Sequence, residues 1–272
     1  MKQSEEYSVV WAPSDNIGDD IQTLAAIEFL KNKGIKNPNL INREDLKNYN
    51  GNPTNLIMNG WFMHEPNSFP PSNKINPIFI SFHCDNRVEY NIINDRNLQY
   101  FKKHEPIGCR DHSTVNRLHQ LGVKAFFTGC LTLLFNPHKG DRSGKYMVDI
   151  NGNCPYMPKI DINKQNYPDY ESINHLLDPK YQYDIDYRLS LAKSLLDKYS
   201  KAEHIYTSRL HCALPCRAFG TPCSFIHPKI EEDIRFGGLL EVLSGSKHFS
   251  NNSGYHKPAL IKIQSALRGY QY

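Results

Sequence analysis

Short apolar runs that alternate with helical segments constrain the fold of this chain more than any other feature. The runs at residues 7–12, 56–58 and 77–82 have the length and composition of buried strands. Between the first two, Asp19-Asp20 open a segment whose apolar residues recur at steps of three and four, which is helical spacing. Buried strands that alternate with helices indicate an α/β fold with parallel sheets.

The same alternation continues along the chain, with one interruption. Further strands are predicted at residues 107–109, 125–127, 146–150, 204–207 and 223–226. Further helices are predicted at residues 98–103, 113–121, 185–199, 210–219, 234–243 and 259–267. The polar stretch 151–184 predicts no clear element.

The interruption, residues 137–144, is polar and contains the Pro and Gly that are typical of segments joining domains. We therefore predict two Rossmann-like domains, an N-terminal one at 1–138 and a C-terminal one at 139–272. The last helix, about 257–268, is a candidate to pack back on the N-terminal domain.

Composition excludes several classes of protein. The chain has 272 residues, of which 39% are hydrophobic and 22% charged, as in ordinary globular proteins. Its net charge of +4 comes from scattered basic residues, so no nucleic-acid partner is expected. No apolar stretch approaches the roughly 20 residues of a membrane span. Because the first residues are polar and lack the apolar core of a secretory signal, we expect a cytoplasmic protein.

Cysteine and histidine patterns predict no metal site. The seven cysteines are odd in number and form no CxxC pair, which fits neither a disulfide framework nor a zinc ribbon. We expect them to be small buried residues. The twelve histidines contain no HExxH pattern.

Polar residues directly after predicted strands are the candidate site residues, because ligands of such folds bind beyond the carboxyl ends of the strands. The first candidates are Asn16, Gly18 and Asp19. Gly18 permits a tight turn or a close approach to a ligand. Asp20 is expected to cap the helix, which leaves Asp19 for the site.

Two more candidates follow strands of the first half. His83 is interpreted either as a ligand-binding residue or as a hydrogen-bonded structural histidine. Arg110 could present its guanidinium fork to a carboxylate or phosphate. Its alternative partner is Asp111 or another acid in an ion pair.

The second half places Ser208, Arg209 and His211 at a predicted helix start. Ser208 is a plausible N-cap. Exposed backbone N–H groups and the positive helix end favour an anion there, and Arg209 adds to this. His211 could move a proton near neutral pH. A purely structural role for this cluster is the alternative. Two arginines from separate halves suggest a small phosphorylated acid as substrate.

An ordered set of segments resembles the polysaccharide pyruvyltransferase family over about residues 8–245. The segments are Asn16-Ile17-Gly18-Asp19, Ile107-Gly108-Cys109-Arg110-Asp111, Thr128-Gly129-Cys130, Ser208-Arg209-Leu210-His211 and Ala218-Phe219-Gly220-Thr221-Pro222. The resemblance implies two Rossmann-like domains in a GT-B-like arrangement, with the active site in the interdomain cleft. It also implies transfer of pyruvate from phosphoenolpyruvate onto a sugar of a glycan as a cyclic ketal, with release of phosphate.

The resemblance also implies roles for residues. Arg110 and Arg209 would hold the carboxylate and phosphate of the donor, and His211 would be the general acid/base. Asp19 falls on the early acidic position of the family and is taken as a second catalytic residue. His83 resembles a residue that lies on the donor side of the site in the family, and it would be a further substrate-binding residue. Ser208, Gly18 and Asn16 complete the predicted substrate-binding set, and no metal or cofactor is implied besides phosphoenolpyruvate as donor substrate.

Some alternatives stay open. The family's glycine-rich turn is here Asn59-Gly60-Trp61-Phe62, with a single glycine. Trp61 is predicted either to stack on a sugar ring or to cover the cleft. The alternative functions are a GT-B-type nucleotide-sugar glycosyltransferase and a catalytically silent glycan-binding protein.

Overall fold

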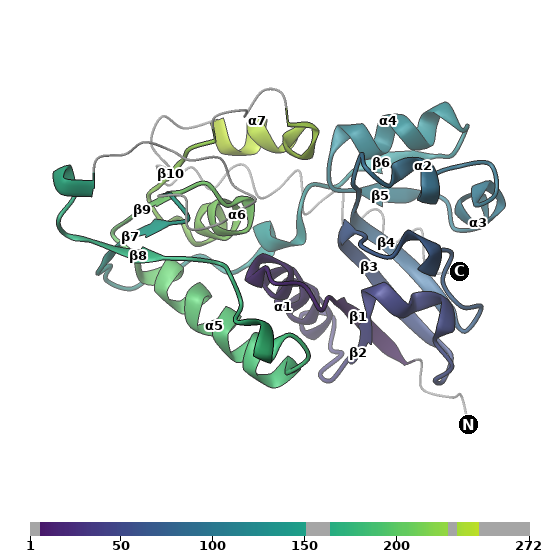
Figure 1. The fold of residues 1–272 in the computed structure, drawn as a ribbon, viewed down its shortest axis with the longest axis horizontal. Helices are drawn as coiled ribbons and strands as arrows, with labels where there is room; N and C mark the ends of the chain where they lie inside the picture. The colour runs from purple at the N-terminus through teal and green to yellow at the C-terminus, as the bar shows by residue number, and fades with distance from the viewer. Residues whose placement is uncertain (1–5, 151–163, 228–232, 245–272) are drawn as a thin grey trace.

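Two parallel sheets organise the computed structural model, which describes residues 6–150, 164–227 and 233–244 (Figure 1). The first has the order β2-β1-β3-β4-β5-β6 and the second β10-β9-β7-β8. Strands of the first sheet are β1 (Tyr7–Trp11), β2 (Asn39–Asn42), β3 (Thr54–Phe62), β4 (Ile75–Cys84), β5 (Ile107–Cys109) and β6 (Ala125–Phe127). Strands of the second are β7 (Lys145–Val148), β8 (Tyr170–Ile173), β9 (His204–Thr207) and β10 (Cys223–Phe225). The expected α/β fold with parallel sheets is confirmed.

The second sheet repeats the topology of the first. In each, the first strand along the chain lies between the second and the third, and the fourth lies beside the third. β10 in the second sheet therefore corresponds to β4 in the first. The order of the strands reverses between the first and the third strand of each sheet. At such a switch point the loops after the neighbouring strands diverge and leave room for a ligand.

Helices pack against the sheets through their apolar faces. The helices are α1 (Ile17–Lys31), α2 (Glu89–Ile92), α3 (Leu98–Lys103), α4 (His112–Gln120), α5 (Ile185–Lys201), α6 (Leu210–Phe219) and α7 (Leu239–Ser244). α3 and α4 bury Phe101, Val115 and Leu118 with Phe79 and Phe82 of β4. Among the described residues, no helix is long and apolar enough to cross a membrane.

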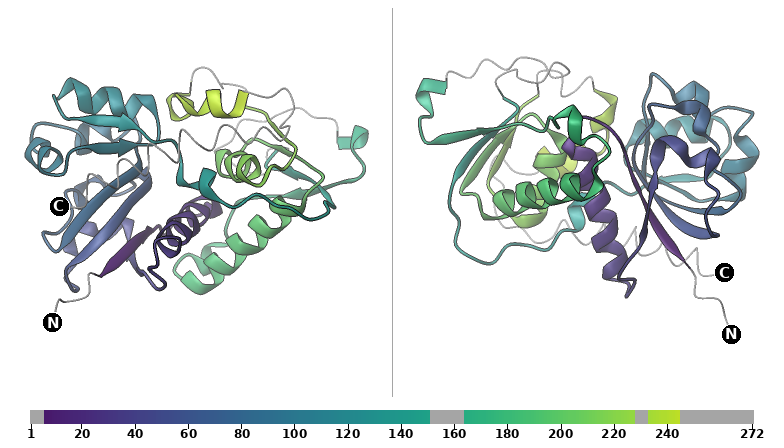
Figure 2. Two further views of the ribbon diagram at one scale, coloured as in Figure 1. Left: turned by 180° about the vertical axis from the view of Figure 1, so that it is seen from behind. Right: turned by 60° about the horizontal axis from the view of Figure 1, so that its bottom comes forward.

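Helix α1 lies between the two sheets (Figures 1 and 2). Its first half places Ile17, Ile21 and Leu24 in the apolar cluster of α5, α6 and the second sheet. Its second half places Phe29 and Leu30 against β1, β3 and β4. A helix that is buried on two sides carries apolar residues almost all round, so α1 belongs to both cores.

A buried ion pair fixes α1 to α5. Arg188 Nε and Nη2 donate to the two carboxylate oxygens of Asp20, each at 2.9 Å. Arg188 Nη1 also donates to the carbonyl oxygens of Ser14 at 2.7 Å and Gln182 at 3.1 Å. Neither Asp20 nor Arg188 is more than 1% exposed. Burial outweighs the pairing with Arg188 and raises the pKa of Asp20 to about 6, so the paired geometry offsets only part of the cost of burying both charges.

A short backbone pairing holds the start of α1 to the second half of the chain. The N–H of Ile17 donates to the carbonyl oxygen of His175 at 2.9 Å, and the N–H of Leu177 donates to that of Asp15 at 2.7 Å. The loop after β8 therefore reaches the loop after β1. This contact brings His175 beside the first turn of α1.

Several sequence predictions needed correction. The helix expected at 234–243 is divided: a 3-10 turn (Ile234–Phe236) precedes α7, with Gly238 between them at φ +82°. β2 and β8 were not predicted, because the first has only two apolar residues and the second lies in the polar stretch 151–184. Asn16, rather than Asp20, caps α1, since its side chain accepts from the N–H of Gly18.

The domain limits and the last helix stay predictions, and the prediction for the cysteines is confirmed. The domain limits 1–138 and 139–272 are not tested by the sheets alone. The helix expected at 259–267, and with it the last helix at about 257–268, lies outside the described residues. The six described cysteines are buried and unpaired, as predicted.

Breaking the Asp20–Arg188 pair should destabilise the protein. Asp20→Ala leaves the Arg188 guanidinium buried without its carboxylate, and we expect a loss of about 3–5 kcal/mol in the free energy of unfolding. The matched control is Asp197→Ala, which removes the exposed pair with Lys201 and should cost about 0.5 kcal/mol or less. Urea unfolding measures both. Equal losses for the two variants would contradict this account of α1.

Candidate active site

A cavity of about 940 Å³ lies where loops after strands of both sheets meet. From the first sheet come the loops after β1, β4 and β5 together with the end of β3, and from the second come those after β8, β9 and β10. Eight of the nine predicted site residues line it, namely Asn16, Gly18, Asp19, Trp61, Arg110, Ser208, Arg209 and His211. The exception is His83. No cluster of metal-ligating side chains occurs among the described residues.

Arg110 is buried in the wall of the cavity, only 2% exposed. Its Nη1 donates to Gln22 Oε1 at 3.3 Å. Among the described residues, its Nε has no hydrogen-bond partner and no carboxylate pairs with its guanidinium. Burial lowers the pKa of Arg110, which Asp111 partly opposes. A buried cation with unused donors is expected beside a site for an anion.

Asp111 is not the ion-pair partner that the sequence offered for Arg110. Its Oδ2 lies 2.5 Å from His83 Nδ1, and its Oδ1 accepts from the N–H of Thr114 at 2.9 Å, which caps α4. Burial and the Arg110 charge lower the pKa of His83 despite Asp111. His83 is therefore neutral, donates from Nδ1 and lies behind the cavity wall. The His83 side chain therefore supports Asp111 and does not line the cavity.

Arg209 is held by an aspartate that the sequence analysis did not single out. Arg209 Nε donates to Asp149 Oδ2 at 2.5 Å, and the N–H of His175 donates to the same oxygen at 3.1 Å. Asp149 directly follows β7 and adopts a left-handed φ of 52°, which Asp tolerates better than most residues. Ser208 Oγ donates to the Asp149 carbonyl at 2.7 Å.

The predicted N-cap at Ser208 is wrong. Arg209 is the N-cap residue of α6, and its side chain forms no capping hydrogen bond. The Ser208 hydroxyl is instead committed to Asp149. His211 has φ −83° and ψ 17°, so the first turn of α6 is irregular where it faces the cavity.

His211 is a neutral imidazole in the free protein. Burial lowers its pKa well below the ordinary value, and the positive charge of Arg110 lowers it further. Its Nε2 has no hydrogen-bond partner among the described residues. A neutral imidazole with a free nitrogen can accept a proton from a bound hydroxyl.

Gly18 allows the first turn of α1 to approach His211 closely. A Cβ at this position would lie 3.3 Å from the His211 Cβ and 3.1 Å from Asn16 Oδ1. Both distances are tighter than ordinary packing. The glycine therefore brings two loops from different sheets into contact at the cavity.

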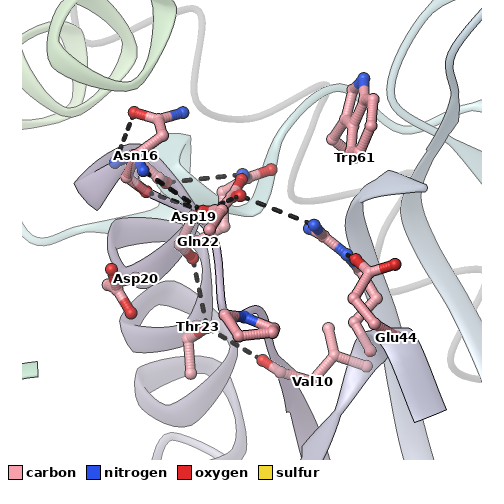
Figure 3. A network of polar contacts seen from close by, with 12 residues as sticks. Val10, Asn16, Asp19, Asp20, Gln22, Thr23, Glu44 and Trp61 are labelled. Atoms are coloured by element: carbon pink, nitrogen blue, oxygen red, sulfur yellow. Dashed lines mark hydrogen bonds and ion pairs between the residues drawn. The ribbon is translucent and has the colours of Figure 1, made fainter. Parts of the chain in front are cut away.

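Asp19 is the centre of a polar network (Figure 3). Its carboxylate accepts from Ser14 Oγ at 2.8 Å and from Gln22 Nε2 at 3.1 Å, and it lies 3.6 Å from Arg43 Nη2. Because Gln22 also accepts from Arg110, the network links Asp19 to the buried arginine. These contacts suit a positioning role better than proton transfer.

Trp61 forms a wall of the cavity near that network. Its Nε1 donates to Asp85 Oδ2 at 2.8 Å. Arg43 and Arg87 lie over the ring, 5.4 and 5.7 Å from its centroid, within cation–π range. The His64 ring is 4.6 Å away. Stacking on a sugar and covering the cavity both stay predictions for this residue.

The structure adds residues that sequence reasoning missed. Asp149 lay inside a predicted strand, His175 in the stretch without predictions, and Arg235 inside a predicted helix. His175 lines the cavity; its Nε2 lies 2.7 Å from the Tyr199 hydroxyl, and burial lowers its pKa to about 3. Gln22 could have been found, because it lies one helical turn after Asp19.

Comparisons with known proteins bear on family and fold. The model of the polysaccharide pyruvyl transferase family matches residues 16–227. An uncharacterised protein of Klebsiella pneumoniae subsp. pneumoniae NTUH-K2044 is similar in structure, with a TM-score of 0.50, 14% identity and coverage of 85% of this chain and 87% of that one. This likeness supports the fold alone. Staphylococcus aureus MnaA with UDP has a TM-score of 0.42 and 9% identity over 97% of both chains, too loose to support an argument. No curated protein matches the chain.

Beside burial, the charge of Arg110 should contribute to the lowered pKa of His211. Because that charge lowers the His211 pKa, Arg110→Gln should move the pKa upward toward its ordinary value. The imidazole signals of ¹⁵N-histidine-labelled protein, followed in pH by NMR, measure this. Lys198→Gln, far from the cavity, is the control and should leave the titration unchanged. A His211 pKa that does not respond to Arg110→Gln would contradict the geometry described above.

Proposed function

The chain belongs to the polysaccharide pyruvyl transferase family, and we propose that it moves pyruvate from phosphoenolpyruvate onto two hydroxyls of a glycan sugar. The product is a cyclic ketal and the leaving group is phosphate. In this proposal the two sheets belong to two domains in a GT-B-like arrangement, and the cavity between their strand ends is the active site.

The single observation that carries the proposal is the buried, unpaired guanidinium of Arg110. A buried charge without a counter-charge costs several kcal/mol, and such groups are retained where a ligand completes them. Arg110 lines the cavity, and its buried Nε, which has no hydrogen-bond partner among the described residues, could donate to an anionic oxygen bound against it. Phosphoenolpyruvate has two anionic groups, a carboxylate and a phosphate.

Arg209 is the second cation suited to the donor. Asp149 and the bonds around it fix the guanidinium at the cavity wall. Arg110 and Arg209 follow β5 and β9, which are strands of different sheets. We assign one anionic group of the donor to each arginine. A single ligand would then be held from both sides, and its carboxylate and phosphate would be bound at a fixed separation.

The chemistry balances with the groups of the donor and acceptor. A proton adds to the methylene carbon of phosphoenolpyruvate, and the first sugar hydroxyl forms a bond from its oxygen to the central carbon. The carbon–oxygen bond to phosphate then breaks, and the phosphate keeps the electron pair. The second hydroxyl closes the ring. The two hydroxyl protons end on the new methyl group and on the released phosphate.

His211 supplies the proton transfers in this proposal. As a neutral imidazole it accepts the proton of the attacking hydroxyl. The bound donor, with its anionic carboxylate and phosphate, opposes the charge of Arg110 and raises the pKa of His211, so the protonated form is available to donate to the methylene carbon. Arginines neutralise the leaving phosphate, and the proposal includes no cofactor beyond the donor.

The test of the proposal is phosphate release. Purified protein with phosphoenolpyruvate and a panel of hexosides should release inorganic phosphate with at least one acceptor. Arg110→Ala should weaken donor affinity by about 10- to 100-fold. No release with any acceptor, and no binding of phosphoenolpyruvate by calorimetry, would contradict it. Thermal stabilisation by nucleoside diphosphates instead would favour the glycosyltransferase alternative, and glycan binding without turnover would favour the silent one.

His211→Gln separates chemistry from donor binding. The amide cannot accept or donate the required proton, so turnover should fall by about 10²- to 10⁴-fold. Affinity for phosphoenolpyruvate should change little, because the arginines remain. Stopped-flow or steady-state phosphate release, together with calorimetry, measures the two quantities. Turnover at the wild-type rate would remove His211 from the mechanism.

A further inference from the structure

Two Asp-X-Arg turns line the cavity, one from each half of the chain. Asp85 and Arg87 follow β4, and Asp233 and Arg235 follow β10, the corresponding strand of the second sheet. In the first turn Asp85 Oδ1 accepts from the N–H of Arg87 at 2.9 Å and from its Nε at 2.7 Å. In the second, Asp233 Oδ1 accepts from the same two groups of Arg235 at 3.0 and 2.8 Å.

The two turns differ in what surrounds them. Arg87 lies over Trp61, and Asp85 accepts from the indole N–H. Arg235 lines the cavity together with Arg110 and His211, and its charge contributes to lowering the pKa of both. The N–H of His112, which begins α4 directly after Arg110-Asp111, donates to the Gly237 carbonyl at 3.1 Å. The Arg235 turn is thus attached to the Arg110 loop.

Arg235 is a partly exposed cation of the cavity wall, as is Arg87, whose side chain is 74% exposed. The Arg235 side chain is 43% exposed, whereas Arg110 is buried and fixed. An ion pair at that exposure contributes little to stability. The Asp233 carboxylate accepts from Nε and Nη2 of Arg235, the edge of the guanidinium that could otherwise donate to a phosphate. Guanidinium binds phosphate oxygens in the same two-point manner as it binds a carboxylate.

We propose that Arg235 is a third donor-binding arginine, which Asp233 holds in the free protein and which exchanges this carboxylate for the phosphate of the bound donor. The proposal rests on the function proposed above, since it takes phosphoenolpyruvate as the anion. Asp233 then holds the Arg235 guanidinium, which lies 5.6 Å from the centroid of the Phe236 ring, until the donor binds. The exchange places three guanidinium groups around the leaving phosphate and the carboxylate of the donor.

The experiment is calorimetric titration of phosphoenolpyruvate, and of inorganic phosphate, into the full chain and four variants. Arg235→Ala should weaken both affinities by about tenfold or more. Arg235→Lys should recover part of the loss, because it restores the charge without the two-point geometry. Asp233→Asn should tighten binding several-fold, since it removes the competing carboxylate. Arg87→Ala is the matched control, and its affinity for phosphoenolpyruvate should stay within about twofold of the wild type.

The outcomes separate this inference from the proposed function. If the wild type binds phosphoenolpyruvate and Arg235→Ala binds it equally well, the inference is overturned and the proposed function stands. Equal losses for Arg235→Ala and Arg87→Ala would also overturn it, because they would indicate a general charge effect. Weaker binding in Asp233→Asn would overturn the exchange. If the wild type binds neither ligand, the proposed function itself fails. Thermal melting of each variant confirms that it is folded.

Discussion

Helix α1 is the element on which the rest of the structure depends. Its two buried sides belong to the cores of different sheets, and the Asp20–Arg188 pair and the backbone bonds to residues 175 and 177 hold its first turn in place. Because the carboxyl ends of both sheets are directed toward that turn, the loops that follow their strands meet around it. The cavity is a consequence of this packing.

The site is built from charges that the protein only partly satisfies. Asp111 is committed to His83 and Thr114, and Asp19 to Ser14, Gln22 and Arg43. Arg110 is left with a neutral amide, and His211 with an unpartnered Nε2 among the described residues. Asp149 and Asp233 pair with the cavity cations Arg209 and Arg235, whereas no carboxylate pairs with Arg110 among the described residues. Such an arrangement attracts an anion and keeps the imidazole neutral until one arrives.

Sequence patterns predicted the regular elements well where the apolar runs were strong. β5, β6, β9, α3 and α6 have the expected bounds. The rule that sites follow strand ends also led to Arg110, Arg209 and His211, since Arg110 directly follows β5 and the other two lie in the turn from β9 into α6. Capping was harder to predict. Asn16, Asp19 and Asp20 are all good caps, and only the buried Arg188 decides that Asp20 is used elsewhere.

The missed residues were missed for local reasons. Asp149 was placed inside a strand that ends one residue earlier, so the same rule would have found it with the correct end. His83 also lies at the end of a strand, but it does not line the cavity. Its buried ring instead bonds to Asp111 behind the cavity wall. Arg235 was assigned to a continuous helix, and the left-handed Gly238 breaks that helix. Of these cases, only that of His83 was decided by a side-chain partner far apart in sequence.

A crystal structure with phosphoenolpyruvate bound tests the central claim most directly. The account predicts the donor in the cavity, with one of its anionic oxygens within hydrogen-bond distance of Arg110 Nε and its other anionic group at Arg209. His211 would lie beside the methylene carbon. A donor bound elsewhere, or bound in the cavity while Arg110 Nε stays without a partner, would contradict the account.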